Sequence, residues 1–207
     1  LAAKKRLEDL NPTLTYNVFP KRLEATSSEA LFRNYDLVVD ATDDIPTRYL
    51  INDTAILCNI PVVYGALYKF EGQVSVFNYQ NGPTYRCLFP EPPADGSLAS
   101  CSEIGVPGIL PGIIGCMQAN EVYKIILGLE GILNGKLLLY DAKKATITHI
   151  AIANKSDGLR KKIKRKEFTL TDQPISCDTE VHIITIQDAL ELEKVKSIEK
   201  DSSWLDQ

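Results

Sequence analysis

The sequence predicts an α/β fold with a mixed sheet, parallel in its first part and antiparallel in its second, and with helices on both faces. Two short apolar runs, residues 37–39 and 61–64, are typical of strands buried on both faces of a parallel sheet. A helical pattern separates these two runs, as a parallel crossover requires. Residues 73–79 instead alternate between apolar and polar, which is typical of an antiparallel strand.

The first part of the chain is expected to contain three helices. The first covers residues 1–10, with apolar residues at positions 1, 3, 7 and 10, and Asn11-Pro12 ends it. An extended segment follows at 14–19, and a short helix begins at Ser27-Ser28. Pro46 lies in the first turn of the third helix, where its missing N–H costs nothing, and this helix runs to about residue 59.

The second part is expected to contain a long loop, a buried helix and two strands. Residues 83–112 are rich in proline and glycine, and loops of this length are usually functional or mobile. A buried helix follows at 113–127, and the strands 136–140 and 146–152 complete a domain that spans residues 1–153.

Two further segments follow this domain. The composition turns polar and basic over residues 154–176, which predicts a linker. The remaining segment, 177–207, has the pattern of one strand and one helix. Such a pair cannot bury a core of its own, so we expect an incomplete appendage.

Composition excludes several classes of protein. The net charge of −4, without a basic stripe, gives no reason to expect nucleic-acid binding. No apolar run approaches the roughly 20 residues that span a bilayer, so no membrane association is expected. Five cysteines at irregular positions (58, 87, 101, 116 and 177) argue against a disulfide framework and for reduced thiols in the cytoplasm.

The strongest candidate for a ligand site is Asp43, with Asp40 and Asp44 beside it. These carboxylates follow an apolar strand, and ligands of open α/β sheets lie at the carboxyl ends of strands. Carboxylate oxygens suit Mg²⁺, which commonly binds one or two protein carboxylates together with nucleotide phosphates. The alternative is that Asp43 or Thr42 only caps the next helix, and spacing does not separate the two. Asp40 is expected to be structural.

Cys101 is the second candidate, because it lies in the long loop between Ser100 and Ser102. An accessible cysteine there can act as a nucleophile or carry a persulfide, although Glu103 nearby would raise rather than lower its pKa. The alternative, which the residues alone favour, is an inert free cysteine. Cys58 and Cys116 fall within the predicted helices and are expected in the core.

A zinc site is not expected from the spacing. Structural zinc needs four ligands, usually in pairs two to four residues apart. Cys87 has no such partner, because position 84 is threonine, and His149 and His182 are isolated. The glycines at 105, 108, 112 and 115 follow no predicted strand and match neither GxGxxG nor the P-loop.

Seven segments together resemble the MoeB/ThiF/HesA family, relatives of the ubiquitin-activating enzymes, in conserved order from about residue 1 to 153. They are Leu10-Asn-Pro12, Asp36-Leu-Val-Val-Asp-Ala-Thr-Asp43 with Arg48, Gly65-Ala-Leu-Tyr-Lys-Phe-Glu-Gly-Gln-Val-Ser-Val-Phe77, Tyr85-Arg-Cys87, Cys101-Ser-Glu-Ile-Gly-Val106, Gly112-Ile-Ile-Gly115 with Gln118-Ala-Asn-Glu-Val-Tyr-Lys124, and Leu139-Tyr-Asp-Ala142. The resemblance implies a Rossmann-like, incomplete adenylation domain.

The resemblance also implies an activity. Members bind ATP and Mg²⁺ and adenylate the C-terminal glycine of a ubiquitin-like sulfur carrier of the MoaD or ThiS type, in molybdopterin or thiamine biosynthesis. Asp43 matches the family's magnesium and ATP aspartate, and Asp44 replaces the asparagine usual after it. Cys101 matches a cysteine that some members use in sulfur transfer. Members are commonly homodimers.

The sequence departs from the family in three places. Members commonly hold zinc with two CxxC pairs, but here these are Thr84-Tyr-Arg-Cys87 and Asn154-Lys-Ser-Asp-Gly158, so folding without zinc is expected. The family's glycine-rich ATP loop and catalytic lysine would lie before Leu1, so activity is expected only of an intact parent protein. Residues 181–198 resemble the start of a rhodanese-like domain without its site loop.

Two other functions stay open at this point. A degenerate family member could act as a non-catalytic module that docks a ubiquitin-like protein. A Rossmann oxidoreductase would share the fold class, but nothing in the sequence indicates NAD binding.

Overall fold

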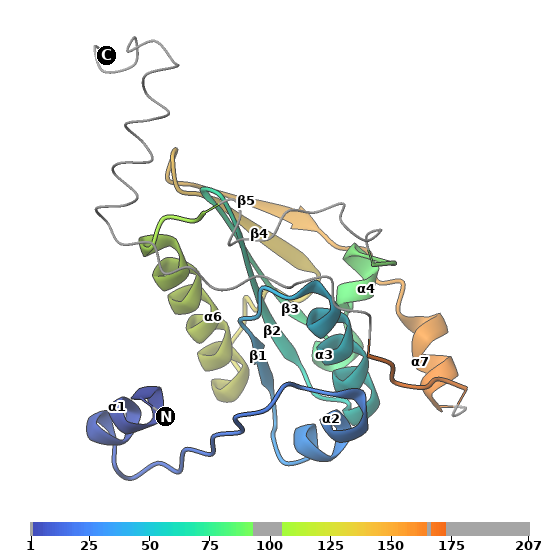
Figure 1. The fold of residues 1–207 in the computed structure, drawn as a ribbon. Helices are drawn as coiled ribbons and strands as arrows, with labels where there is room; N and C mark the ends of the chain where they lie inside the picture. Colours follow the sequence, from blue (N-terminus) through green and yellow to red (C-terminus); the bar gives the residue numbers. More distant parts are fainter. Residues whose placement is uncertain (1, 93–104, 165–166, 173–207) are drawn as a thin grey trace, which may run out of the picture.

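The computed structural model describes residues 2–92, 105–164 and 167–172 and has a five-stranded sheet in the order β1-β2-β3-β4-β5 (Figure 1). The strands are β1 (Val38–Asp40), β2 (Val62–Tyr68), β3 (Glu71–Phe77), β4 (Lys136–Asp141) and β5 (Thr146–Ala151). The pair β1 and β2 is parallel, and the three later pairs are antiparallel. The predicted mixed sheet is therefore confirmed.

Helices cover both faces of this sheet, as predicted. They are α1 (Ala2–Leu10), α2 (Ala25–Phe32), α3 (Ile45–Cys58), α4 (Tyr85–Leu88), α6 (Ile109–Leu127) and α7 (Asp157–Lys164), together with the 3-10 turn η1 (Tyr79–Asn81). Helix α3 packs on one face beside α2, and α6 packs on the other against β2 and β3 (Figure 1). None of the described helices has the length and apolar character that crossing a membrane requires.

Strand β2 lies between two hydrophobic cores, which explains its nearly continuous apolar sequence. Val62, Tyr64 and Ala66 belong to the core on the α3 side. Val63 belongs to the core on the α6 side, together with Leu110 of that helix. Because successive side chains of a strand point to opposite faces, a strand covered on both faces needs apolar residues at almost every position.

Helix α3 has the boundaries that the sequence predicts. Pro46 lies in its first turn, and Asn59 ends it in the left-handed conformation, with φ of 57°. Asparagine tolerates this conformation better than most residues, so a helix that ends there commonly turns sharply. The turn leads directly into Pro61 and β2.

Several boundaries differ from those that the sequence predicts. Helix α6 begins at Ile109, not at 113, because Pro111 falls in the first turn, where backbone N–H groups have no partner within the helix. The expected loop also contains α4. Helix α2 begins at Ala25, whose N–H donates to Asp172. The segment 14–19, which the sequence predicts only to be extended, belongs to neither a helix nor a strand, and β1 has no second neighbour among the described residues.

Part of the expected linker at 154–176 is structured. Residues 157–164 form α7, and Arg160 on this helix donates to the carbonyl oxygen of Gly82 at 2.9 Å. The domain boundaries at 153 and 176 stay predictions, and the appendage at 177–207 lies outside the described residues.

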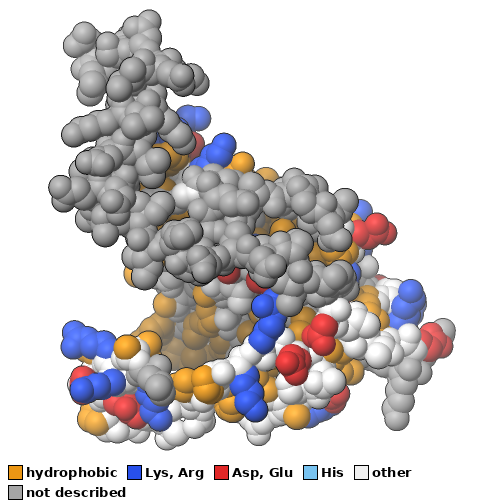
Figure 2. Space-filling view, in the orientation of Figure 1, with side chains coloured by type: hydrophobic (Ala, Val, Ile, Leu, Met, Phe, Trp, Pro, Cys, Tyr) orange, Lys and Arg blue, Asp and Glu red, His pale blue; other side chains and the backbone are white. Residues whose placement is uncertain are grey.

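The outer face of α6 is apolar and exposed. Ile109, Tyr123 and Ile126 are each about 70% exposed. Cys116 is also exposed, so the expectation that it lies in the core is wrong, whereas Cys58 packs against the core as expected. Figure 2 shows a hollow lined by hydrophobic side chains over α6 and β1.

Helix α1 lies away from the sheet (Figure 1). It has no buried residue.

A buried ion pair fixes α4 to α3. Asp53 accepts bidentate hydrogen bonds from Arg86, at 2.8 Å from Nε and 2.7 Å from Nη2. The guanidinium carbon lies 4.7 Å from the centroid of the Tyr49 ring, which adds a cation–π contact. Tyr49 also donates to the carbonyl oxygens of Phe89 and Glu91, so this cluster holds residues 85–91 against α3.

We predict that Asp53→Ala lowers the free energy of unfolding by about 3 kcal/mol, because it leaves the Arg86 charge mostly buried without its partner. Urea denaturation measures this loss. The matched control is Glu29→Ala, which removes an exposed ion pair with Arg33 and should cost at most about 0.5 kcal/mol. Equal losses in the two variants would contradict the assignment of the Asp53 pair.

Candidate functional site

Three aspartates lie at the carboxyl end of β1, and the structure gives each a different environment. Asp40 is the last residue of the strand and is 2% exposed. Its carboxylate accepts hydrogen bonds from the backbone N–H and the hydroxyl of Thr42, at 2.9 and 2.7 Å. Burial raises the pKa of Asp40, and the positive charge of Arg48 opposes this rise. Asp40 therefore holds the turn together, in agreement with its expected structural role.

Asp44 caps helix α3. Its Oδ2 accepts hydrogen bonds from the backbone N–H of Thr47, at 3.0 Å, and from the Thr47 hydroxyl. The same oxygen forms an ion pair with Arg22 at 2.9 Å. The helix cap that the sequence places at Asp43 or Thr42 is thus Asp44, one residue after Asp43 and two after Thr42. Only Oδ1 of Asp44 is without a partner among the described residues, so its assignment to the cofactor stays a prediction.

Asp43 lies between these two residues and is exposed. Within the described part of the chain, its carboxylate forms neither a hydrogen bond nor an ion pair. Asp43 is therefore the only one of the three aspartates that is exposed and has both carboxylate oxygens available to a ligand. Such an exposed carboxylate fits Mg²⁺, which binds proteins through one or two carboxylates and keeps several waters.

Arg48 connects the aspartate turn to the sheet. Its guanidinium donates to the carbonyl oxygen of Thr42 through Nε, at 3.2 Å, and through Nη2, at 2.5 Å. A third hydrogen bond reaches the hydroxyl of Tyr64 at 3.3 Å, and that hydroxyl donates to Gln73. Arg48 therefore fixes the backbone immediately before Asp43 and also compensates the buried charge of Asp40.

Gln118 on α6 reaches the same strand end from the other face of the sheet. Its side-chain amide donates to the carbonyl oxygens of Asp40, at 2.8 Å, and Val63, at 3.2 Å. Gly65 leaves the space for this amide, because a Cβ at that position would lie 2.4 Å from Cδ of Gln118. The sequence does contain a signal for this role, since Gln118 is a polar residue one helical turn after the buried Ile114.

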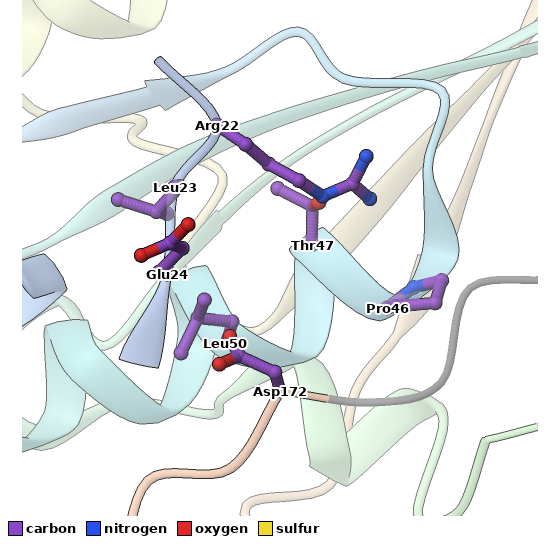
Figure 3. Close-up of a pocket in the computed structure, with 7 residues that line it drawn as sticks. All are labelled: Arg22, Leu23, Glu24, Pro46, Thr47, Leu50 and Asp172. Atoms are coloured by element: carbon purple, nitrogen blue, oxygen red, sulfur yellow. The ribbon is translucent and has the colours of Figure 1, made fainter. Parts of the chain in front are cut away.

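A surface pocket of about 220 Å³ lies beside the cap of α3 (Figure 3). Its lining residues are Arg22, Leu23, Glu24, Pro46, Thr47, Leu50 and Asp172. Arg22 points toward Thr47 in this view. The pocket is thus adjacent to the aspartate turn, but two carboxylates line it and Asp43 does not.

One sequence-predicted site residue and one pair of segments have still to be placed. Cys101 lies outside the described residues, so its role stays a prediction. Residues 84–87 and 154–158 take the place of the family's two CxxC pairs, and the structure brings them together. The backbone N–H of Lys155 donates to Sγ of Cys87 at 3.3 Å.

Comparison with known proteins identifies the family and several relatives of this sequence. The model of the ThiF family matches residues 1–161. The sulfur carrier protein adenylyltransferase of Thermus thermophilus is 47% identical over 157 residues, which cover 73% of this chain and 58% of that protein. The probable molybdopterin-synthase adenylyltransferase of Pyropia yezoensis is 44% identical over 153 residues, which cover 73% of this chain and 40% of that protein.

A third relative is the adenylyltransferase and sulfurtransferase MOCS3 of Dictyostelium discoideum, 40% identical over 76% of this chain and 37% of its own length. This chain thus spans between 37% and 58% of the length of these three relatives. Among solved structures, Escherichia coli MccB with ATP has a TM-score of 0.60 and 12% identity, covering 74% of this chain and 48% of that one. This likeness supports the fold alone.

We predict that Arg48→Ala lowers the free energy of unfolding by about 2–3 kcal/mol at neutral pH, because the Thr42 carbonyl oxygen loses its two hydrogen bonds and the buried Asp40 loses a nearby positive charge. Arg48→Lys keeps the charge but cannot reproduce the two-point contact with Thr42, so an intermediate loss is expected. Urea denaturation of the two variants checks this order.

The same loss should depend on pH. Because burial raises the pKa of Asp40 above its unfolded value, ionisation of Asp40 destabilises the folded protein at high pH, and this cost disappears as the carboxyl becomes protonated. The difference between wild type and Arg48→Ala should therefore shrink as the pH falls from 7 toward 4. A difference that stays constant over this range would show that Arg48 does not act through Asp40.

Proposed function

Because this chain belongs to the ThiF family, we propose that the intact protein adenylates the C-terminal glycine of a ubiquitin-like sulfur carrier with ATP. The observation that carries the proposal is Asp43, the one free carboxylate at the strand end that matches the family's magnesium and ATP aspartate. The names of the relatives support a sulfur carrier as the substrate, since they include a sulfur carrier protein adenylyltransferase and a molybdopterin-synthase adenylyltransferase.

The proposed reaction transfers the adenylyl (AMP) group of ATP to the carrier. A carboxylate oxygen of the carrier's terminal glycine attacks the α-phosphorus of ATP, the bond to the β-phosphate oxygen breaks, and pyrophosphate leaves. Mg²⁺, when bound, would offset the negative charge of the phosphates during this step. Asp43 would hold the metal, and Arg48 and Gln118 would keep the turn that carries Asp43 at a fixed position on the sheet.

The segment after α4 is proposed to cross over the carrier's extended C-terminal tail. The structure supports the start of this path, because Arg86 and Tyr49 hold residues 85–91 against α3. Cys101 lies further along the same segment, outside the described residues. There it would receive or pass on sulfur after adenylation, as the resemblance implies.

The carrier's globular body is proposed to rest on the strands of the antiparallel part of the sheet. Every residue of β5 is exposed, and Ile147 and Ile150 are 51% and 45% exposed. Tyr68, at the end of β2, is 49% exposed. Apolar side chains on an uncovered sheet surface suit contact with another protein.

The intact protein is further proposed to form a homodimer, and the apolar outer face of α6 offers a surface for such contact.

We predict that Asp43→Ala in the full-length protein lowers carrier-dependent ATP–pyrophosphate exchange by about 100-fold or more, because the metal loses its protein ligand. The matched control is Asp36→Ala, which removes an exposed carboxylate at the other end of the same strand and should leave exchange unchanged. Undiminished exchange in Asp43→Ala would refute the assignment of Asp43. A wild-type protein that binds the carrier without any exchange would instead be a docking module.

We predict that the substitution Cys101→Ala affects sulfur transfer but not adenylation. The variant is expected to keep pyrophosphate exchange, because the thiol takes no part in the attack on the α-phosphorus, and to lose sulfur transfer to the carrier. Thiocarboxylate formation on the carrier, followed by mass spectrometry, measures the second step. A variant that keeps both activities would show that Cys101 has no catalytic role.

A further inference from the structure

The turn before α4 and the segment before α7 meet at the place where the family commonly holds zinc. In the matching CxxC patterns, Thr84 and Cys87 take the positions of the first cysteine pair, and Asn154 and Asp157 take those of the second. Four cysteine sulfurs would bind zinc there in tetrahedral geometry. Only one of the four, Cys87, is present.

These residues do not fit a zinc ion. Nowhere in the described ranges do three or more His, Cys, Asp or Glu side chains cluster closely enough to hold a metal. The side chain of Asn154 is already committed, because its Nδ2 donates to the carbonyl oxygen of Asn81 and its Oδ1 accepts from Ser156. A pocket at this place, about 240 Å³ in volume, is lined by Arg86, Lys155 and Lys162 among others, and their charges oppose a cation.

Cys87 instead accepts hydrogen bonds from both segments. Its Sγ lies 3.3 Å from the backbone nitrogen of Thr84 and 3.3 Å from the backbone nitrogen of Lys155. The hydroxyl of the fully buried Thr84 lies 3.5 Å from the same sulfur. The sulfur thus connects the two segments without a metal.

Arg160 adds a second connection between the segments. Its Nε donates to the hydroxyl of the buried Ser156, and its Nη2 donates to the carbonyl oxygen of Gly82, each at 2.9 Å. Burial lowers the pKa of Arg160, and proximity to Cys87 and Asp157 opposes this. In the folded protein, the Arg160 guanidinium therefore forms hydrogen bonds with two protein acceptors in place of water, and one acceptor lies on each segment.

We propose that this hydrogen-bonded latch, formed by Cys87, Asn154, Ser156 and Arg160 with residues 81–84, replaces the family's zinc site, so that the protein folds without zinc. The latch fixes residues 82–87, from which the proposed crossover segment departs. In this chain, Arg160 would therefore hold together the two segments that, by the resemblance, a zinc ion would otherwise join. The proposal concerns this region alone and does not depend on the adenylation proposal.

The test uses the full-length protein, purified from cells grown with added zinc. Elemental analysis should find well below one zinc per chain, and a strong zinc chelator should leave the melting temperature unchanged. Arg160→Ala should lower the melting temperature by about 4–8 °C, because two hydrogen bonds to otherwise buried partners are lost. Lys161→Ala, an exposed neighbour on α7, is the matched control and should leave it unchanged.

A gain-of-zinc variant completes the experiment. The triple variant Thr84→Cys, Asn154→Cys, Asp157→Cys supplies the three missing sulfurs and should bind about one zinc per chain, with a melting temperature that the chelator lowers. Stoichiometric zinc in the wild-type protein would overturn the proposal, as would an Arg160→Ala variant as stable as Lys161→Ala. A correctly folded triple variant that takes up no zinc would show that this place is not the counterpart of the zinc site.

Discussion

The site depends on the compensation of one buried charge, the carboxylate of Asp40. An ionised carboxylate that is 2% exposed is costly unless hydrogen bonds and an opposite charge surround it. Thr42 supplies two hydrogen bonds, and Arg48 supplies the charge while it also donates to the backbone of Thr42. The chain therefore turns sharply at the end of β1, and this turn places Asp43 at the surface.

This turn is held from both faces of the sheet. Arg48 approaches from α3, and Gln118 approaches from α6 with hydrogen bonds to Asp40 and Val63. Gly65 is required for the second approach, because a side chain there would collide with Gln118. A carboxylate supported by rigid elements on both sides is preorganised, as the proposed adenylation would require of Asp43.

Several interactions also fix the position of α4 and of the residues on either side of it. The Asp53–Arg86 pair, the Tyr49 hydroxyl and the latch around Arg160 all hold residues 82–91 from different sides. The latch differs from a zinc site in one physical respect. Metal–sulfur bonds form only with a bound ion, whereas the hydrogen bonds of Arg160 and Cys87 form as soon as the two segments fold together.

Much of the fold could be predicted from the sequence, because its signals are local. The apolar runs before Asp40 and Gly65 indicate buried strands, Pro46 marks the start of α3, and the alternation after Gly72 indicates an antiparallel strand. The predictions that failed concern a helix start and the exposure of a side chain, which the local sequence pattern does not determine. Pro111 is compatible with both a loop and a first helical turn, and Cys116 faces outward although its helix is strongly apolar.

The sequence by itself determined that a candidate ligand lies among three aspartates at the end of a buried strand. Only the tertiary structure decided which of the three is free. Asp40 is buried beside Arg48, Asp44 caps α3 and pairs with Arg22, and Asp43 remains exposed. The charged partners of the first two lie outside this turn, because Arg48 belongs to α3 and Arg22 is 22 residues before Asp44 in sequence. A carboxylate's role depends on its neighbours in space, and folding alone brings those neighbours together.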